Sequence, residues 1–215
     1  MDKDQWRMNK EDYTSGIQDA ERRVITSKVE FRADDEEPKI EGIASRVNEW
    51  YDLGYFEERV SKGAFDSIMK DDVRALFNHD PNLVLARTKS KTLELFTDNK
   101  GNLAYRYKTP QRSYALDLED AVKSGDVDQS SFAFRVAEEK WEWRDDNKDL
   151  KKDRRTILKL EKLYDVSPVT YPASPSTNVA ARKQNDHKEE LINAKTQRNK
   201  NILLLAKSKL TLIGK

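Results

Sequence analysis

The feature that most limits the fold of this chain is a series of short segments rich in β-branched, aliphatic and aromatic residues, separated by turn-forming residues. Segments of this length and composition predict β-strands. The first two lie close together and predict a hairpin. The predicted strands cover residues 24–31, 39–47, 73–81, 83–87, 93–96, 103–107, 127–136 and, as one strand or two, 157–171.

Two segments predict helices between these strands. Phe65, Ile68 and Met69 have the i, i+3, i+4 spacing of a short amphipathic helix over 64–70. Residues 113–124 predict a longer helix, with Ser113 as the N-cap and Gly125 at the C-terminal cap. The sequence therefore predicts a β-rich α+β fold with few helices.

Composition excludes several classes of function. The chain of 215 residues has 40 Lys+Arg and 39 Asp+Glu, so bulk charge gives no reason to expect a nucleic-acid or membrane partner. The chain contains no cysteine, which excludes disulfides, thiolate metal sites and a cysteine nucleophile. It also lacks an apolar run of about 18 residues and an apolar N-terminal leader, so we expect a soluble intracellular protein.

Composition also divides the chain into three parts. Residues 1–23 are polar and charged, and predict a flexible N-terminal arm. Residues 24–183 contain all the predicted strands and form the expected folded domain. Residues 184–215 are polar and then mix lysines with leucine and isoleucine, which predicts a helical C-terminal appendage.

His79 is the first candidate for chemistry. The chain has two histidines, and His187 lies in the charged C-terminal segment, which leaves His79 as the imidazole in the expected core. Histidine suits proton transfer near neutral pH. Taken alone, a histidine at the end of a strand is more often a hydrogen-bonded structural residue, so its role depends on what faces it.

Ser131 is the second candidate, and strand parity singles it out. On the strand 127–136, Ser130 shares a face with Phe132 and Phe134 and is expected in the core. Ser131 lies on the opposite face beside the small Ala133, which leaves room for a substrate chain. A serine hydroxyl becomes a good nucleophile when a base removes its proton, and His79 lies 52 positions upstream.

A third group would have to orient the imidazole. Glu161 and Asp165 are the acidic candidates after Ser131, and the residues alone leave both open. Asp80 is less suitable, because neighbours on an extended chain point to opposite sides. A histidine-based metal site lacks a second core histidine, and there is no glycine-rich phosphate loop. We therefore expect neither a metal nor another cofactor.

Several motifs together resemble a known family. Phe77–Asp80 precedes a predicted helix, followed by Asp128–Phe134 and then by Leu163–Ala173. Their order and spacing resemble the prohead (procapsid) maturation proteases of tailed phages, relatives of the herpesvirus assemblins. Glu41–Ala44 and Gly63–Phe65 fit the same pattern, and the resemblance covers residues 24–183. It implies a compact antiparallel β-barrel ringed by a few helices.

The resemblance also implies a serine endopeptidase. The base would be His79, the nucleophile Ser131 and the third member Asp165, in preference to Glu161. The sequence departs from the family at Ala133, where a glycine is common, and at Ser130, where a larger residue is common. A methyl group at Ala133 could narrow the cleft beside the nucleophile.

The implied partners are a phage major capsid protein and scaffold. The enzyme would cleave segments of these proteins, and itself, inside the assembling procapsid in the host cytoplasm. Self-association and removal of the C-terminal appendage by the enzyme are left open. The alternative is a non-catalytic virion or scaffold component on the same fold, because a fold does not fix its function.

Overall fold

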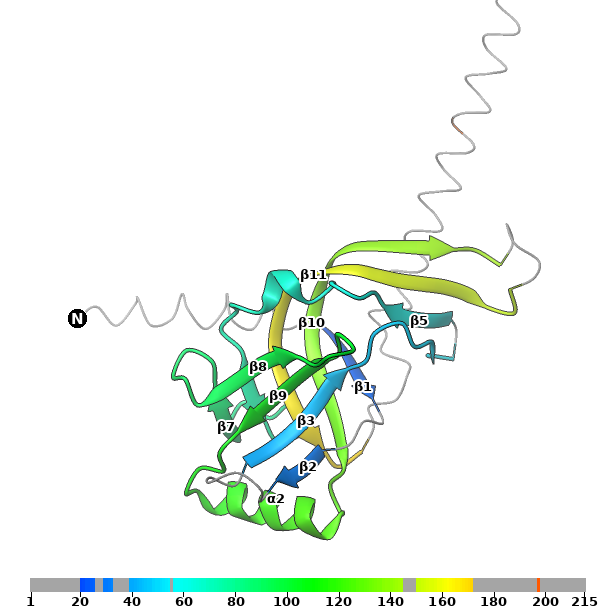
Figure 1. Cartoon of the computed structure of the whole chain (residues 1–215). Helices are drawn as coiled ribbons and strands as arrows, with labels where there is room; N and C mark the ends of the chain where they lie inside the picture. The colour runs from blue at the N-terminus through cyan, green and yellow to red at the C-terminus, as the bar shows by residue number, and fades with distance from the viewer. Residues whose placement is uncertain are drawn as a thin grey trace, which may run out of the picture. The chain divides into compact units, whose positions relative to one another are not determined.

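Strand β11 (Asp153–Val169) is the longest strand of the protein and organises the larger of its two sheets, as the computed structural model shows (Figure 1). The structure describes residues 20–25, 29–32, 39–54, 56–144, 150–171 and 197. The chain divides into two units, residues 1–176 and 177–215, and all the elements below belong to the first. The predicted appendage 184–215 lies outside the described residues except for Gln197, and the predicted arm does so up to position 19.

The larger sheet has seven strands. Along one side β11 pairs antiparallel with β10 (Gln129–Glu142), and the two strands run together across the domain (Figure 1). Along its other side β11 pairs in parallel with β5 near its start and with β6 near its end. β1 flanks β10, β4 flanks β5, and β7 flanks β6; these strands are β1 (Glu21–Ile25), β4 (Tyr51–Asp52), β5 (Phe56–Val60), β6 (Arg74–Leu76) and β7 (Val84–Arg87).

The smaller sheet has four antiparallel strands in the order β2-β3-β9-β8. The hairpin predicted near the N-terminus is confirmed by the pairing of β2 with β3. The turn at Asp98–Gly101 joins β8 to β9, and Gly101 has the positive φ of 94° that such a turn uses. The four strands are β2 (Val29–Arg32), β3 (Lys39–Ser45), β8 (Leu93–Thr97) and β9 (Leu103–Tyr107).

The core lies where the two sheets pack against each other. β3 of the smaller sheet contacts β1, β10 and β11 of the larger one. Ile40, Tyr105 and Phe132 are fully or almost fully buried in this layer. The rings of Phe132 and Phe134 lie 4.5 Å apart, as the predicted core face requires. Burial of such side chains is the main driving force for folding.

Helix α2 (Ser113–Ser124) has the bounds that the sequence predicts. Ala115, Leu118 and Val122 form its buried stripe, and the helix packs beside β2. Gly125 ends it in the left-handed conformation, with its N–H donating to the carbonyl of Val122. The N-cap is Arg112 rather than the predicted Ser113, and it makes no side-chain capping bond.

The predicted closed barrel ringed by helices is wrong. Both sheets are open, and no ladder among the described residues joins β1 to β4 or β2 to β8. Closure of a barrel needs a pair between the two edge strands. Here β11 instead pairs on one side with two short parallel strands, β5 and β6. The domain consists of two sheets packed against each other. Among the residues of 20–171 that the structure describes, α2 is the one α-helix.

Two predicted elements also differ in detail. The strand predicted over 24–31 is two strands in different sheets, β1 and β2. The short helix predicted over 64–70 is only a 3-10 turn, η1 (Asp66–Ile68). Its local backbone bonds are of the i to i−3 type, and it also bonds to β11: Ala64 O accepts from Leu160 N–H, and Ser67 Oγ donates to Leu160 O.

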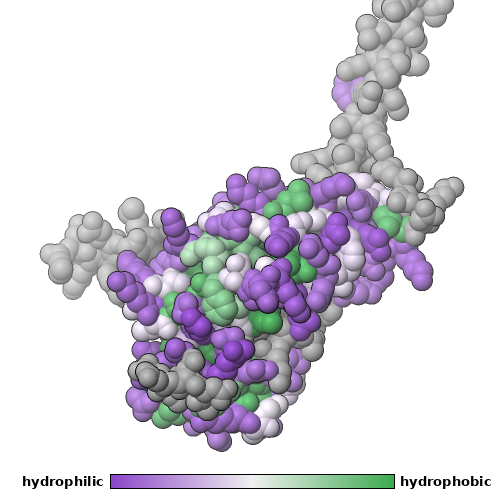
Figure 2. Space-filling view, viewed as in Figure 1, coloured by the Kyte–Doolittle hydropathy of each residue, from purple (hydrophilic) through white to green (hydrophobic). Residues whose placement is uncertain are grey.

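The surface is mostly hydrophilic, with hydrophobic residues in small separate groups on the face seen in Figure 2. The exposed large hydrophobic side chains among the described residues are Leu116, Leu158 and Tyr171. None of the helices in the described part of the chain has the length and apolar character to span a bilayer.

Candidate active site

His79 projects from a tight turn that follows β6. Asn78 and His79 both have left-handed backbone conformations, with φ of 53° and 59°. Such conformations are uncommon outside glycine and cost energy unless the surroundings hold them. Here Asp80 N–H donates to Phe77 O, and Asn78 N–H donates to Pro168 O. The turn therefore rests against the end of β11.

The Asn78 side chain strengthens this attachment. Its Oδ1 accepts a hydrogen bond from the backbone N–H of Thr170 at 2.9 Å. Its Nδ2 donates to Thr170 Oγ1 at 3.0 Å. One asparagine thus uses both ends of its amide on the residue that follows β11, and this fixes the direction in which the next residue, His79, leaves the turn.

Ser131 lies in the middle of β10, opposite Ser167 of β11 and Val24 of β1. The two adjacent serines point to opposite sides, as strand parity predicts. Ser130 Oγ donates to the Tyr105 hydroxyl in the core at 3.1 Å. Ser131 Oγ lies 2.6 Å from His79 Nε2.

The other ring nitrogen meets a carboxylate. His79 Nδ1 lies 2.6 Å from Asp165 Oδ1, in strand β11. Glu161, the other acidic candidate, is exposed and pairs with Arg135 at 2.7 Å. The structure therefore brings His79, Ser131 and Asp165 into one row and leaves Glu161 outside it.

Asp165 has a second partner that sequence reasoning missed. Ser167 is fully buried, and its Oγ donates to Asp165 Oδ1 at 2.7 Å. The same carboxylate oxygen thus accepts from Ser167 and faces His79. The signal was available, because residues two apart on a strand share a face. Asn78 could likewise have been suspected from its position beside His79.

The surroundings of Ser131 are more closed than the sequence predicts. The side beside Ala133 was expected to be open, yet Ser131 and Ala133 are both fully buried. β1 covers this edge of β10, and Ser131 Oγ lies 3.0 Å from the carbonyl oxygen of Arg23. The side chain of His79 keeps 11% of its surface exposed. The side chain of Asp165 keeps 9%, so the row meets solvent at these two residues and not at Ser131.

A buried ionic network fixes β1 in this place. Arg23 Nε lies 2.5 Å from Glu58 Oε1, and Arg155 Nη1 lies 2.5 Å from Glu21 Oε2. Arg155 also contacts Glu58 and Glu139, so the network joins β1, β5, β10 and β11. Burial alone would lower the pKa of Arg23, but Glu58 and Glu21 outweigh it and raise that pKa above its ordinary value. Both guanidinium groups stay charged.

No set of three or more histidine, aspartate or glutamate side chains in the described part of the chain is placed to hold a metal ion. The row consists of the Ser131 hydroxyl, the His79 imidazole and the Asp165 carboxylate. A serine, a histidine and a carboxylate in this order form the arrangement that hydrolases of several unrelated folds use.

The row has the Ser-His-Asp arrangement known from hydrolases, and comparison with known proteins supplies the family. The model of the caudovirus prohead serine proteases matches residues 23–190, and the chain belongs to this family. The resemblance found in the motifs is thereby confirmed. The protein is a protease of procapsid maturation, which acts inside the assembling procapsid.

Individual relatives are more distant. The prohead protease of Enterobacteria phage HK97 is 27% identical over 164 residues, which cover 74% of this chain and 67% of the relative. The structure of the bacteriophage T4 capsid assembly protease covers 71% of this chain and 95% of its own, with 12% identity and a TM-score of 0.37. A score of this size does not establish a shared fold.

Proposed function

We propose that the protein is a serine endopeptidase in which Ser131 is the nucleophile, His79 the general base and Asp165 the group that orients His79. The observation that carries this proposal is the unbroken row of contacts of 2.6 Å from Ser131 Oγ through the imidazole to Asp165 Oδ1. Hydrogen bonds between charged and neutral groups of this length are strong. The membership in a family of serine proteases supports the same reading.

In the first step, Ser131 Oγ attacks the carbonyl carbon of the scissile peptide bond while its proton passes to His79 Nε2. The imidazolium then donates this proton to the leaving amine, and an acyl-enzyme remains. Water, deprotonated by His79, releases the acyl group and restores Ser131. Asp165 accepts the Nδ1–H bond throughout, which selects the neutral tautomer with a free Nε2 and stabilises the imidazolium.

The carbonyl of Arg23 competes for the same hydroxyl proton. The Ser131 hydroxyl has one proton and two acceptors, His79 Nε2 at 2.6 Å and Arg23 O at 3.0 Å. The shorter contact favours the histidine. A hydroxyl that donates to Arg23 O is not activated. The position of β1 therefore influences the fraction of time in which the Ser131 hydroxyl donates to His79.

The substrates that we propose are segments of scaffold and major capsid protein, and segments of the protease itself. The site of action would be the procapsid in the host cytoplasm. We further propose that residues 1–23 are an arm, that 24–183 form the catalytic domain, and that 184–215 direct the protease into the particle and are then removed by it. Intact mass of the protein from mature particles, compared with Ser131→Ala particles, tests the last point.

Co-expression of the protease with capsid protein and scaffold tests the function as a whole. We expect wild type to process the two partners, and Ser131→Ala to leave them full length while still entering particles. Ser130→Ala is the matched control, and we expect its cleavage rate to stay within about tenfold of wild type, because the Ser130 hydroxyl donates to Tyr105 in the core, away from His79. No processing by wild type would favour a non-catalytic virion component. Activity of Ser131→Ala would overturn the assignment of the nucleophile.

A further inference from the structure

A groove with a volume of about 840 Å³ runs beside β7. Its walls are β7, the turn that follows β7, and the segment 106–112 at the end of β9. The volume falls within the range of about 300–1,000 Å³ that is usual for binding clefts. His79, Ser131 and Asp165 do not line it, so the groove is separate from the site described above.

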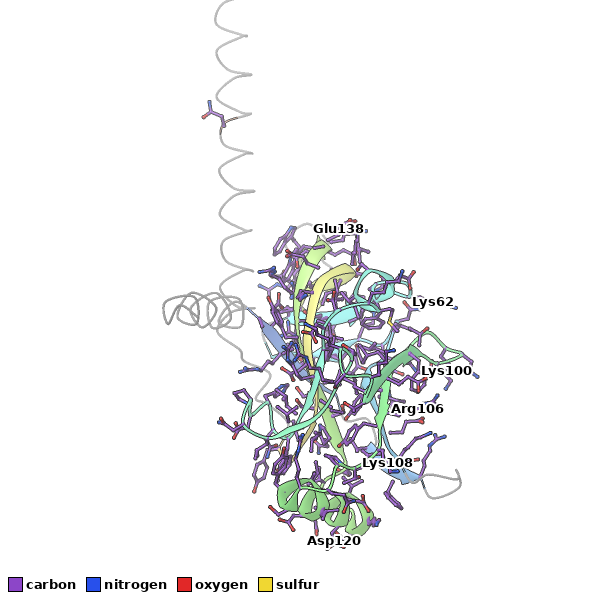
Figure 3. The ribbon with its side chains drawn as sticks, turned by 90° about the vertical axis from the view of Figure 1, so that its left-hand side faces the viewer. Lys62, Lys100, Arg106, Lys108, Asp120 and Glu138 are labelled. Carbon is purple, nitrogen blue, oxygen red and sulfur yellow. The ribbon has the colours of Figure 1, made fainter. Side chains whose placement is uncertain are left out.

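The groove concentrates positive charge. The chain as a whole has a net charge of +1. One acidic residue, Glu94, lines the groove, against six basic ones: Lys39, Arg87, Lys91, Arg106, Lys108 and Arg112. Figure 3 shows Arg106 and Lys108 together on one side of the domain, with Lys100 and Lys62 further along the same side. Clefts lined by one sign of charge attract ligands of the other sign.

Part of this charge is held by the protein itself. Arg106 pairs with Glu94 at 2.7 Å, and Arg87 pairs with Asp72 at 2.5 Å. Lys91 and Arg112 have no carboxylate partner among the described residues, and both are exposed. Arg112 is held in place by bonds to Val84 O and the Tyr114 hydroxyl. The rim of the groove thus presents at least two cations that are available to a ligand.

The floor of the groove is apolar. Leu85, Ala86 and Tyr107 are buried and line it, together with Val84 and Pro110. A basic rim over an apolar floor fits a peptide that carries both acidic and aliphatic side chains. It fits a nucleic-acid strand less well, because base stacking needs exposed aromatic faces, and Tyr107, the aromatic residue in the lining, is buried.

We propose that this groove binds an acidic stretch of the polypeptide that the protease cleaves. The inference rests on the proposed function and adds a second contact for the same substrate. The strand order β10-β11-β6-β7 puts the groove about three strand spacings, or roughly 15 Å, from the strand of Ser131. An extended chain covers that distance in about five residues. The acidic stretch should therefore lie at least about five residues from the cleaved bond.

Binding can be measured without cleavage on the Ser131→Ala protein. The probe is a fluorescent 12-residue peptide of alternating glutamate and leucine, and its control has glutamine in place of glutamate. We expect the glutamate peptide to bind at least about tenfold more tightly, with an affinity that falls as salt rises. Lys91→Glu/Lys108→Glu should weaken its binding by about tenfold or more.

The matched control variant is Lys62→Glu/Lys100→Glu. It reverses the same number of charges on exposed residues of the same side, and neither residue lines the groove (Figure 3). Equal loss of binding in both variants would show general electrostatic attraction and overturn the proposal. So would equal binding of the glutamine peptide, or tighter binding of a dT12 oligonucleotide than of the glutamate peptide.

Two further experiments test whether the groove binds the substrate. The chain has its own acidic run, Asp34–Glu37. If replacing these four residues by Ser or Asn tightened peptide binding more than about tenfold, the chain itself would be the occupant and the proposal would be wrong.

With active protein, Lys91→Glu/Lys108→Glu should raise KM for a substrate carrying the acidic stretch and leave KM for a short peptide without this stretch unchanged. Loss of both cleavages alike would contradict the proposal, whereas an inactive wild type would instead contradict the proposed function.

Discussion

Asn78 Oδ1 and the backbone N–H of Thr170 are joined by a hydrogen bond of 2.9 Å, which connects the turn that carries His79 to the end of the strand that carries Asp165. Asn78 thus connects the segments of His79 and Asp165, which we propose act together, without touching a reacting atom itself. The tie is needed because the turn adopts two consecutive left-handed conformations without glycine.

Asn78→Gly should lower kcat by about 10- to 100-fold and leave KM nearly unchanged. Glycine accepts the left-handed conformation but loses both side-chain bonds to Thr170, so His79 is less well oriented. Steady-state kinetics and a thermal melt measure the two effects. Asn82→Gly, in the same loop, is the control. A change in KM alone, with normal kcat, would contradict a positioning role for Asn78.

Asp165→Asn should lower kcat by about 10⁴-fold, because an amide cannot select the productive imidazole tautomer. Glu161→Gln should stay close to wild type, since Glu161 pairs with Arg135 at the surface. Initial rates on one substrate compare the two variants. If Asp165→Asn kept normal activity and Glu161→Gln lost it, the assignment of Asp165 as the group that orients His79 would be wrong.

Arg155→Ala should destabilise the fold by about 3–5 kcal/mol, because it leaves buried carboxylates without their partner. Glu21 and Glu58 would remain in the interior with one guanidinium between them. Denaturant unfolding measures the loss. Lys159 lies on β11, as Arg155 does, and Lys159→Ala, which breaks an exposed pair with Glu138 of β10, should cost less than about 1 kcal/mol. Equal effects would show that the network contributes no more than a surface pair.

The pKa of Asp72 is lowered below its ordinary value, first by hydrogen bonds from Arg87. A carboxyl with a lowered pKa in the folded state stabilises the fold above its unfolded pKa of about 3.9, and this stabilisation is lost as the pH falls through the folded value. Asp72→Asn should therefore flatten the decrease of stability below about pH 4. Melting curves between pH 2.5 and 6 measure this, with Asp120→Asn on α2 as the control. A stability that depended more strongly on pH in Asp72→Asn than in wild type would contradict the predicted direction of the effect.

Strand parity was enough to place Ser131 but not to choose between Asp165 and Glu161. Ser130 and Ser131 are neighbours on a regular stretch of β10, so their opposite directions follow from the pleat. On β11 the ladder skips Tyr164 and then Glu161, so the register shifts twice between the two acids. Counting residues in twos fails across such irregularities, and the choice of Asp165 came from the family resemblance.

The parts that could not be predicted depend on contacts between distant segments. The apolar pattern of residues 24–31 is the same whether they form one strand or two, and the split puts β1 beside β10 and β2 beside β3. The closed barrel, which the family resemblance implied, was wrong because β11 pairs in parallel with β5 and β6 and the sheet stays open. Local patterns such as the stripe of α2 were reliable because they need no distant partner.

The place of β1 beside Ser131 has a consequence for synthesis. Arg23 and Ser131 are 108 positions apart, and His79 and Asp165 are 86 apart. At about 5–20 residues per second, the strand that borders the nucleophile leaves the ribosome roughly 5 to 20 s before the nucleophile does. Asp165, the acid that we propose orients His79, follows later still. The row of proposed catalytic groups therefore cannot form before Asp165 has left the ribosome, so we expect no self-cleavage through this row until β11 is complete.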